Sequence, residues 1–225
     1  MRPRRAARLS PTGGPTSDGE PGVLLVTPEP LVERMAGPAI RCLELARALA
    51  RSGRVGPVSV ASLTTAELEE PDVAVRAVDG PTLRALAADA GSVVVQGDVI
   101  GLHPWLAAAD VPLVVDAYDP FQLEQLEQAR GLGEARRRAV VRDCVRALDR
   151  QLGRADFVLC ASARQRAMWI GHLGALGRVN PVTYAAAHDL SGLLAVVPFG
   201  VPPTPPRPVP RARRRRRDTE RDDGH

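Results

Sequence analysis

The chain has 225 residues, of which 44% are hydrophobic, enough for one domain or slightly more with a packed core. Its net charge of +4 comes from the two ends. Residues 9–202 hold 18 arginines against 22 acidic residues, which argues against a basic nucleic-acid-binding surface on the fold. The three cysteines are widely spaced, which predicts free thiols and no metal site. The sequence has no apolar leader segment and no apolar run of about 18 residues, which predicts a cytoplasmic protein.

The first predicted unit is a strand, a loop and a helix. Residues 1–21 show no hydrophobic periodicity and are expected to form a disordered arm. A buried strand is predicted over 23–27 and an amphipathic helix over about 38–51. The apolar stripe of this helix is expected to consist of Ile40, Leu43, Ala46 and Ala50, and its polar stripe of Arg41, Glu44, Arg47 and Arg51.

Strands and helices then alternate along the chain. Strands are predicted at 58–61, 73–78, 92–96, 111–116, 156–160 and 193–197. Helices are predicted at 81–90, 102–109, 121–153 and from Ser162 to about 176; the third has a break at 131–133 and an apolar stripe of Val141, Val145, Leu148 and Leu152. We therefore expect an α/β fold over residues 22–202, with an open, mostly parallel Rossmann-like sheet and helices on both faces. The Pro/Arg-rich residues 203–225 are expected to form a disordered tail.

The first predicted helix begins at Gly37-Pro38, directly after the loop that follows the first strand. Glycine allows a ligand to approach the backbone closely, proline suits the first helical turn, and a helix N-terminus attracts anions. The pair is therefore either a phosphate-binding turn or simply favourable capping chemistry. The GxGxxG and GxxxxGK[ST] fingerprints do not occur, which argues against a nicotinamide or P-loop enzyme.

Polar residues follow the predicted strands at their carboxyl ends, where open α/β sheets place their chemistry. Asp116, Tyr118 and Asp119 are candidates for orienting a hydroxyl or for general-base catalysis, unless Asp119 only caps the next helix. The other candidates are Arg34, Gln96, Asp98, His103, Ser162 and Arg164. For three of them a purely structural role stays open as an alternative to ligand binding. Arg34 could be a solvated charge, His103 part of a structural turn and Ser162 a helix cap.

Two further features are expected to be structural. Trp169 is predicted to lie in the core, and Arg136-Arg137-Arg138 to form a solvated helix face offset by Glu134 and Asp143. The arginine run at 213–217 is suited to contact with nucleic acid or anionic lipid, although we interpret it as an accident of reading frame.

Several stretches, taken in their order and spacing, resemble the N-terminal half of GT-B glycosyltransferases of the family 4 type, in particular an actinobacterial group. The resemblance covers about residues 22–202. The stretches are Val-Thr-Pro-Glu-Pro and Met-Ala-Gly-Pro-Ala-Ile-Arg in the first unit, Val-Val-Val-Gln-Gly-Asp and Leu-His-Pro-Trp-Leu in the middle, and then Val-Val-Asp-Ala-Tyr-Asp-Pro, Leu-Cys-Ala-Ser-Ala-Arg-Gln-Arg and Val-Val-Pro-Phe-Gly-Val-Pro.

The resemblance implies two Rossmann-like domains with the active site in the cleft between them. The N-terminal domain takes a hydroxyl acceptor and the C-terminal one a nucleotide-sugar, which is a co-substrate, so that neither a cofactor nor a metal is needed. Carried over to this sequence, Gly37 and Pro38 form the loop that reaches the donor diphosphate. The catalytic candidates are Asp116, Tyr118 and Asp119, in a region where many members have a histidine. The acceptor would meet Arg34, Gln96, Asp98, His103, Ser162 and Arg164.

Family members commonly act on cell-envelope precursors, which implies a cytoplasmic location with peripheral contact to the inner face of the membrane. The chain departs from the family after Pro198–Pro202, where a Pro/Arg tail stands in place of a second domain. We therefore expect a truncated or frame-shifted product that is inactive alone. Two alternatives stay open: a non-catalytic α/β binding module whose basic tail docks to an anionic partner, and a small α/β enzyme that uses Asp116 or Asp119 alone.

Overall fold

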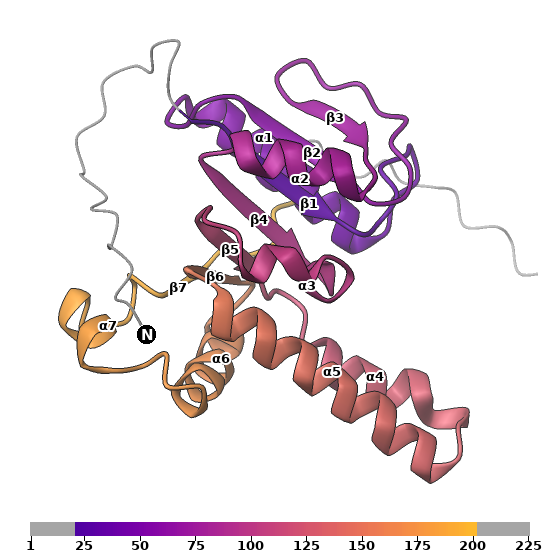
Figure 1. Cartoon of the computed structure of the whole chain (residues 1–225), viewed down its shortest axis with the longest axis vertical. Helices are drawn as coiled ribbons and strands as arrows, with labels where there is room; N and C mark the ends of the chain where they lie inside the picture. Colours follow the sequence, from indigo (N-terminus) through magenta and orange to yellow (C-terminus); the bar gives the residue numbers. More distant parts are fainter. Residues whose placement is uncertain (1–20, 202–225) are drawn as a thin grey trace, which may run out of the picture.

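The computed structural model describes residues 21–201. Residues 1–20 of the predicted arm and the whole predicted tail, 203–225, lie outside the described residues. Within 21–201 the chain forms an α/β fold around one open sheet (Figure 1). Its seven strands are all parallel and lie in the order β3-β2-β1-β4-β5-β6-β7. The predicted fold class is therefore confirmed. Because β4 returns to the side of β1, a topological switch point lies between these two strands.

The strands agree closely with the predicted ones. β1 (Val23–Thr27) and β4 (Ser92–Gln96) have the predicted bounds, because their apolar runs are buried at nearly every position. The remaining strands differ from prediction by one or two residues at their ends. They are β2 (Val58–Ser62), β3 (Ala74–Ala77), β5 (Leu113–Asp116), β6 (Phe157–Cys160) and β7 (Leu194–Val196).

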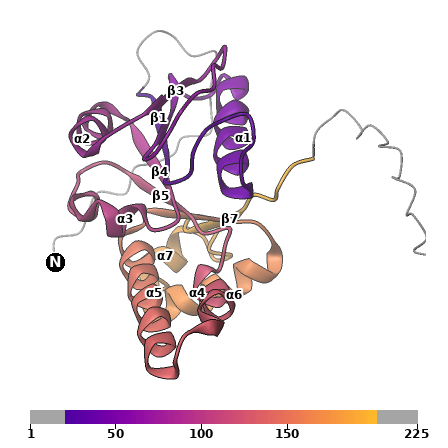
Figure 2. The ribbon, with the colours of Figure 1, turned by 90° about the vertical axis from the view of Figure 1, so that its right-hand side faces the viewer.

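Two hydrophobic cores lie on opposite faces of the sheet, and Figure 2 shows α1 and α2 on opposite sides of it. In the described part, the helix residues of one core come from α1 (Gly37–Ser52) alone. Right-handed crossovers explain this, because β1 to β3 run in one direction across the sheet and β4 to β7 in the other. The second core holds Trp169, as expected, with residues of α2 (Gly80–Asp89), α3 (Val99–Leu102), the 3-10 helix η1 (Pro104–Ala107), α5 (Glu134–Arg154) and α6 (Ala163–Ala175).

Two helical segments differ from the prediction. The single helix expected over 102–109 is instead α3 followed by η1, because Pro104 lacks an N–H and disfavours the α conformation at His103. The short helix α7 (Pro181–Ala186) was not predicted. Its start is marked by Asn180, whose side chain accepts hydrogen bonds from the first turn in a capping box.

The orientation of α1 corrects the predicted stripes at two positions. Arg41, expected on the polar face, is only 3% exposed, whereas Ile40, expected to be buried, is 45% exposed. Helical periodicity sorts residues by polarity alone. It gives no sign that Arg41 meets a partner 75 residues further along the chain.

A helical hairpin, residues 121–154, projects from the body of the molecule (Figure 1). It consists of α4 (Phe121–Gln128), the 3-10 helix η2 (Ala129–Gly131) and α5, so the predicted break at 131–133 is confirmed. The predicted apolar stripe of α5 is buried only at Leu148 and Leu152, while Val145 is exposed. The outer turns of α5 lie beside α4 and away from the sheet, which leaves this part of the stripe uncovered.

Candidate functional site

Buried polar side chains gather at the carboxyl end of the sheet. Alternate residues of a strand point to opposite faces, and the last residue of each of β1, β2, β4 and β5 falls on the face that α1 covers. With Arg41 of α1 these residues make up five of the six buried polar or charged residues in the described chain. We call this set the switch-point cluster: Thr27, Ser62, Gln96, Asp116 and Arg41.

The centre of the switch-point cluster is a bidentate ion pair. Arg41 donates from Nε and from Nη2 to the two oxygens of Asp116, each at 2.8 Å. Gln96 Nε2 donates to Oδ2 of the same carboxylate at 2.9 Å. Both Asp116 oxygens therefore already accept hydrogen bonds in a buried setting. The geometry makes Asp116, a catalytic candidate from sequence, an anchor that ties α1 to β5.

Gln96 keeps unused hydrogen-bonding capacity. Its amide nitrogen is occupied by Asp116, but its Oε1 is buried and has no hydrogen-bond partner among residues 21–201. A buried acceptor without a partner is costly. Gln96 is thus the member of the cluster with a spare hydrogen-bond acceptor, which a bound hydroxyl would reach only by displacing the side chains that cover it.

Arg41 also organises two aromatic rings. The guanidinium carbon lies 5.2 Å from the ring centre of Tyr118 and 4.9 Å from that of Phe199, and the two rings meet edge to face at 5.5 Å. Arg41 Nη1 donates to the carbonyl of Val197 at 2.9 Å. The segment that follows β7 is therefore held against α1 and β5.

A groove runs between α1 and the segment after β7. Its volume is about 470 Å³, and its walls combine apolar side chains such as Ile40, Leu45 and Val201 with the carboxylate of Glu44 and the guanidinium of Arg41. Arg41 thus contributes both to the wall of this groove and to the buried ion pair with Asp116.

Tyr118 and Asp119 follow β5 and are both half-buried. Burial, reinforced by Asp119 and then Asp116, raises the pKa of the Tyr118 hydroxyl, which is therefore neutral at physiological pH. Burial, reinforced by Glu124, raises the pKa of Asp119 to about 6. Asp119 does not cap the next helix, because the N-cap of α4 is Pro120, with no side-chain cap. The two residues therefore lie at the sheet edge with side chains that are not committed to capping.

Gly37 opens α1 at the same edge of the sheet. Its N-cap is Ala36, which makes no side-chain cap, so the first amides of the helix lack the usual intrahelical or capping acceptor. Gly37 is exposed, and a Cβ added to it would meet nothing within 4 Å. The N-terminus of α1 is thus open to a ligand, and Pro38 lies in the first turn as predicted.

The loops on either side of the switch point are fixed to one another. Gly97, at φ +54°, lies so close to Pro28 that an added Cβ would come within 3.3 Å of its ring. On the other side, Ser62 donates to the carbonyl of Glu29 at 2.8 Å and accepts from the amides of residues 64 and 65. These contacts position the loop that leads from β1 to Gly37.

His103 and Asp98 lie outside the switch-point cluster. The His103 ring lies beside Gly80 at the start of α2 and edge-on to Trp105, so it belongs to the face opposite α1. The carboxylate of Asp98 folds over Gly101 of α3, where an added Cβ would collide with it. The structure therefore does not bring these two candidates together with Asp119.

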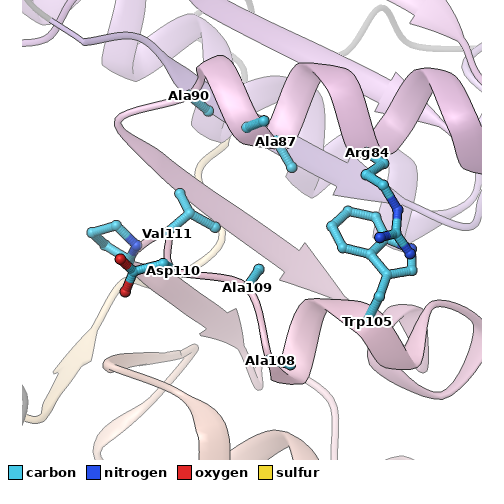
Figure 3. A pocket seen from close by; sticks show the side chains of 10 residues that line it. Arg84, Ala87, Ala90, Trp105, Ala108, Ala109, Asp110 and Val111 are labelled. Carbon is cyan, nitrogen blue, oxygen red and sulfur yellow. The ribbon is translucent and has the colours of Figure 1, made fainter.

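A second hollow, shown in Figure 3, lies between α2 and η1. Its volume is about 520 Å³ and its lining is dominated by alanine. The guanidinium of Arg84 stacks on the Trp105 ring at 4.8 Å at one end of the hollow, and Asp110 lies at the other. None of the residues predicted for the site lines this hollow.

The remaining candidates are placed individually. Ser162 is the N-cap of α6, and its hydroxyl accepts from the amide of Gln165 at 3.2 Å, which confirms the capping role. Arg164 and Arg34 are exposed, and neither forms an ion pair within the described residues. Whether these three residues meet an acceptor stays a prediction.

Sequence reasoning missed three residues that shape the site. Arg41 was assigned to a solvated stripe and Phe199 to the exit from the last strand. Gln165 falls inside a predicted helix and was given no role, yet its Nε2 donates to the carbonyl of Tyr118 at 2.7 Å. Trp169 Nε1 donates to the preceding carbonyl, of Ala117, at 2.7 Å. No local sequence pattern predicts such long-range hydrogen bonds from side chains to backbone carbonyls.

Together these features define a Rossmann-like α/β domain with a polar cluster at its switch point. Neither protein-family models nor curated proteins give a match to this chain. Among the helices of residues 21–201, none has the length and apolarity that a bilayer crossing requires. The same part of the chain holds no group of three or more His, Cys, Asp or Glu side chains suited to a metal ion.

Proposed function

We propose that this chain supplies the N-terminal, acceptor-side domain of a GT-B-type glycosyltransferase, which transfers a sugar from a nucleotide-sugar to an acceptor hydroxyl. The observation that supports this most directly is a juxtaposition at the switch point. The open N-terminus of α1 begins at Gly37, and the next turn of that helix is tied through Arg41 to the strand that leads to Tyr118 and Asp119. The open helix end and the Asp119 carboxyl, which is hydrogen-bonded to Glu124, thus share one edge of the sheet.

The anion site suits the leaving group of such a transfer. When the acceptor oxygen bonds to the anomeric carbon, the bond from that carbon to the diphosphate breaks and negative charge grows on the diphosphate oxygen. The free amides and the dipole at the start of α1 favour that charge. Arg41 contributes little net charge here, because Asp116 neutralises it. Its role in the proposal is to fix the distance between the two parts of the site.

Asp119 is suited to act as the general base that takes the proton of the acceptor hydroxyl. A pKa of about 6 leaves it mostly ionised at pH 7 and more basic than an ordinary aspartate. Tyr118, which stays neutral, can donate a hydrogen bond, and Gln96 Oε1 can accept one. These three residues are therefore proposed to orient and activate the acceptor.

The proposal is tested first by binding. The full chain, labelled with ¹⁵N, is titrated with UDP-glucose, UDP and inorganic pyrophosphate. Because the resemblance assigns the nucleotide-sugar to a C-terminal domain, we expect this domain alone to bind the probes only weakly. Small shifts of the Gly37 and Ala39 amides are expected with all three probes, since each carries phosphate groups, and shifts near Tyr118 only with UDP-glucose. Gly37→Ala should weaken binding by about tenfold, a loss of about 1.4 kcal/mol, because the added methyl occupies the approach to the helix end.

The matched control is Gly171→Ala, in α6, where an added Cβ also meets nothing within 4 Å. Both substitutions should leave the Tm unchanged or slightly raised, since alanine restricts the unfolded chain more than glycine. If none of the three probes shifts the amides at the start of α1, or if both variants weaken binding equally, the proposal is wrong and a non-catalytic binding module becomes the better interpretation.

A further inference from the structure

The hairpin, residues 121–154, is only lightly anchored to the fold. α4 has no buried residue, and α5 buries only Ala147, Leu148, Gln151 and Leu152, all in its last two turns. The outer half of the hairpin therefore packs essentially on itself and stands away from the sheet (Figure 1). Only the base of the hairpin therefore contributes to the core, and its outer half offers a surface that the rest of residues 21–201 does not cover.

That surface carries apolar side chains that the fold leaves uncovered. Leu123 is 52% exposed and Leu126, one turn later on α4, is 46% exposed. Leu132 at the turn and Val145 on α5 are also exposed. Exposed leucines on successive turns of one helix form a small apolar patch, which suits a surface for interaction.

The same hairpin is the basic part of an otherwise acidic fold. It holds eight arginines against five acidic residues, while the rest of residues 21–201 holds ten arginines against 15 acidic residues. Glu127, Glu134 and Asp143 pair with neighbouring arginines in exposed contacts, which are weak. Arg136 and Arg150 have no ion-pair partner within the described chain, so positive charge is left in excess.

We propose that the hairpin docks on the surface of an anionic lipid bilayer, with its leucines among the headgroups and its arginines on lipid phosphates. Arginine beside exposed leucine is the composition of helices that lie in a membrane interface. Nucleic acid would use the arginines but give the leucines nothing to pack on. A second copy of the hairpin, in a two-fold contact, would bring two basic surfaces together. This inference does not rest on the proposed glycosyl transfer.

The test is flotation of the full chain with vesicles of phosphatidylcholine alone or with 30% phosphatidylglycerol. Because the arginine run at 213–217 would itself attract anionic lipid, every protein carries glutamine at those five positions. We expect binding to the anionic vesicles only, weakened by 0.5 M salt. Arg136→Gln with Arg150→Gln should reduce partitioning about fivefold for each arginine removed.

Leu123→Ser with Leu126→Ser should reduce partitioning by about tenfold, since both leucines then leave the headgroup region. The matched controls are Val182→Ser on α7 and Arg54→Gln in the loop after α1, both at exposed positions, and they should change partitioning less than twofold, roughly the noise of the assay. Hydrogen exchange should show protection within 121–146 on vesicle binding. The proposal would be overturned if the control variants lost as much vesicle partitioning as the hairpin variants, or if amide protection appeared only outside 121–146. It would also be overturned if light scattering showed a dimer that the leucine variants dissociate.

Discussion

Arg41 and Asp116 form the one charge pair in residues 21–201 whose two side chains are both nearly inaccessible to solvent. Two buried charges that neutralise each other contribute little net stability, because desolvation offsets their attraction. Removing one partner is different, since it leaves the other charge buried alone. The pair is therefore better understood as fixing the relative positions of α1, β5 and the segment after β7 than as a source of stability.

We expect Arg41→Met to lower the free energy of unfolding by about 3–5 kcal/mol, because it leaves the Asp116 carboxylate without its main partner. Urea unfolding at pH 7 measures this. The double variant Arg41→Met with Asp116→Leu should recover most of the loss. If the two single losses simply add in the double variant, the pair does not act as a unit.

The Asp119 carboxyl makes the stability of the protein depend on pH. Its pKa is about 6 in the folded protein, raised by burial and then by Glu124, and about 3.9 in an unfolded chain. Between these values the folded state binds more protons, so the group opposes folding at pH 7 and does so less as the pH falls toward 4.

We therefore expect the Asp119 carboxyl to add to the Tm of the wild type as the pH falls from 7 to 5. Asp119→Asn should raise the Tm at pH 7 and remove this contribution. Glu124→Gln should lower the pKa of Asp119, followed by ¹³C NMR of its carboxyl carbon. A carboxyl that titrates at 4 or below in the folded protein would contradict this account of its surroundings.

Part of the site was visible in the sequence and part was not. Asp116, Tyr118 and Asp119 were found because polar residues directly follow a continuous apolar strand, a position that topology alone sends to the ligand edge of the sheet. Arg41 was not found, because a helical stripe shows the side on which a residue lies but not its distant partner. Phe199 was missed for the same reason.

At the level of the secondary-structure elements, helix starts divide into capped and uncapped ones. α2, α6 and α7 each have a side chain that accepts from the first turn, whereas α1 does not. Capping residues are the strongest local signal of a helix start, which is why Ser162 was assigned correctly from sequence. α3, α4 and α5 likewise begin without a side-chain cap, so the open start of α1 is one of four among the α-helices of residues 21–201.

Ser162→Ala should lower the free energy of unfolding by about 1 kcal/mol, because the amide of Gln165 loses its acceptor. Ser162→Asp should retain the stability, since aspartate caps equally well. Ser191→Ala is the control: this serine is exposed and its hydroxyl bonds the exposed Asp189 carboxylate, so the loss should be smaller than for Ser162→Ala. A loss of ligand binding in Ser162→Asp at full stability would add a binding role to the capping one.

Element prediction succeeded where burial is uniform and failed where it is partial. β1 and β4 are buried along their length, so their bounds could be predicted to the residue. In the hairpin, by contrast, Val145 belongs to a stripe that looks like a core face and is exposed instead. Hydrophobic periodicity predicts an amphipathic helix, but it cannot show what length of that helix packs against the sheet.

For the molecule as a whole, alternation of strands and helices was enough to predict a parallel sheet with helices on both faces. It did not show that α1 alone would supply the helix residues of one core, nor that the hairpin would project. Both follow from the order of the strands and the length of one connection. These properties depend on pairings between distant segments, which a single sequence does not reveal.

The contact between Arg41 and Val197 has a consequence for how the molecule opens. β7 has three residues and lies at the edge of the sheet, where local opening ordinarily requires little free energy. Here the amide of Val197 donates to Cys160 and its carbonyl accepts from the buried guanidinium. If the edge frays at Val197, the buried guanidinium of Arg41 loses the hydrogen bond that it donates to the Val197 carbonyl. Local opening of this edge and loss of the polar interior are therefore linked into one cooperative event.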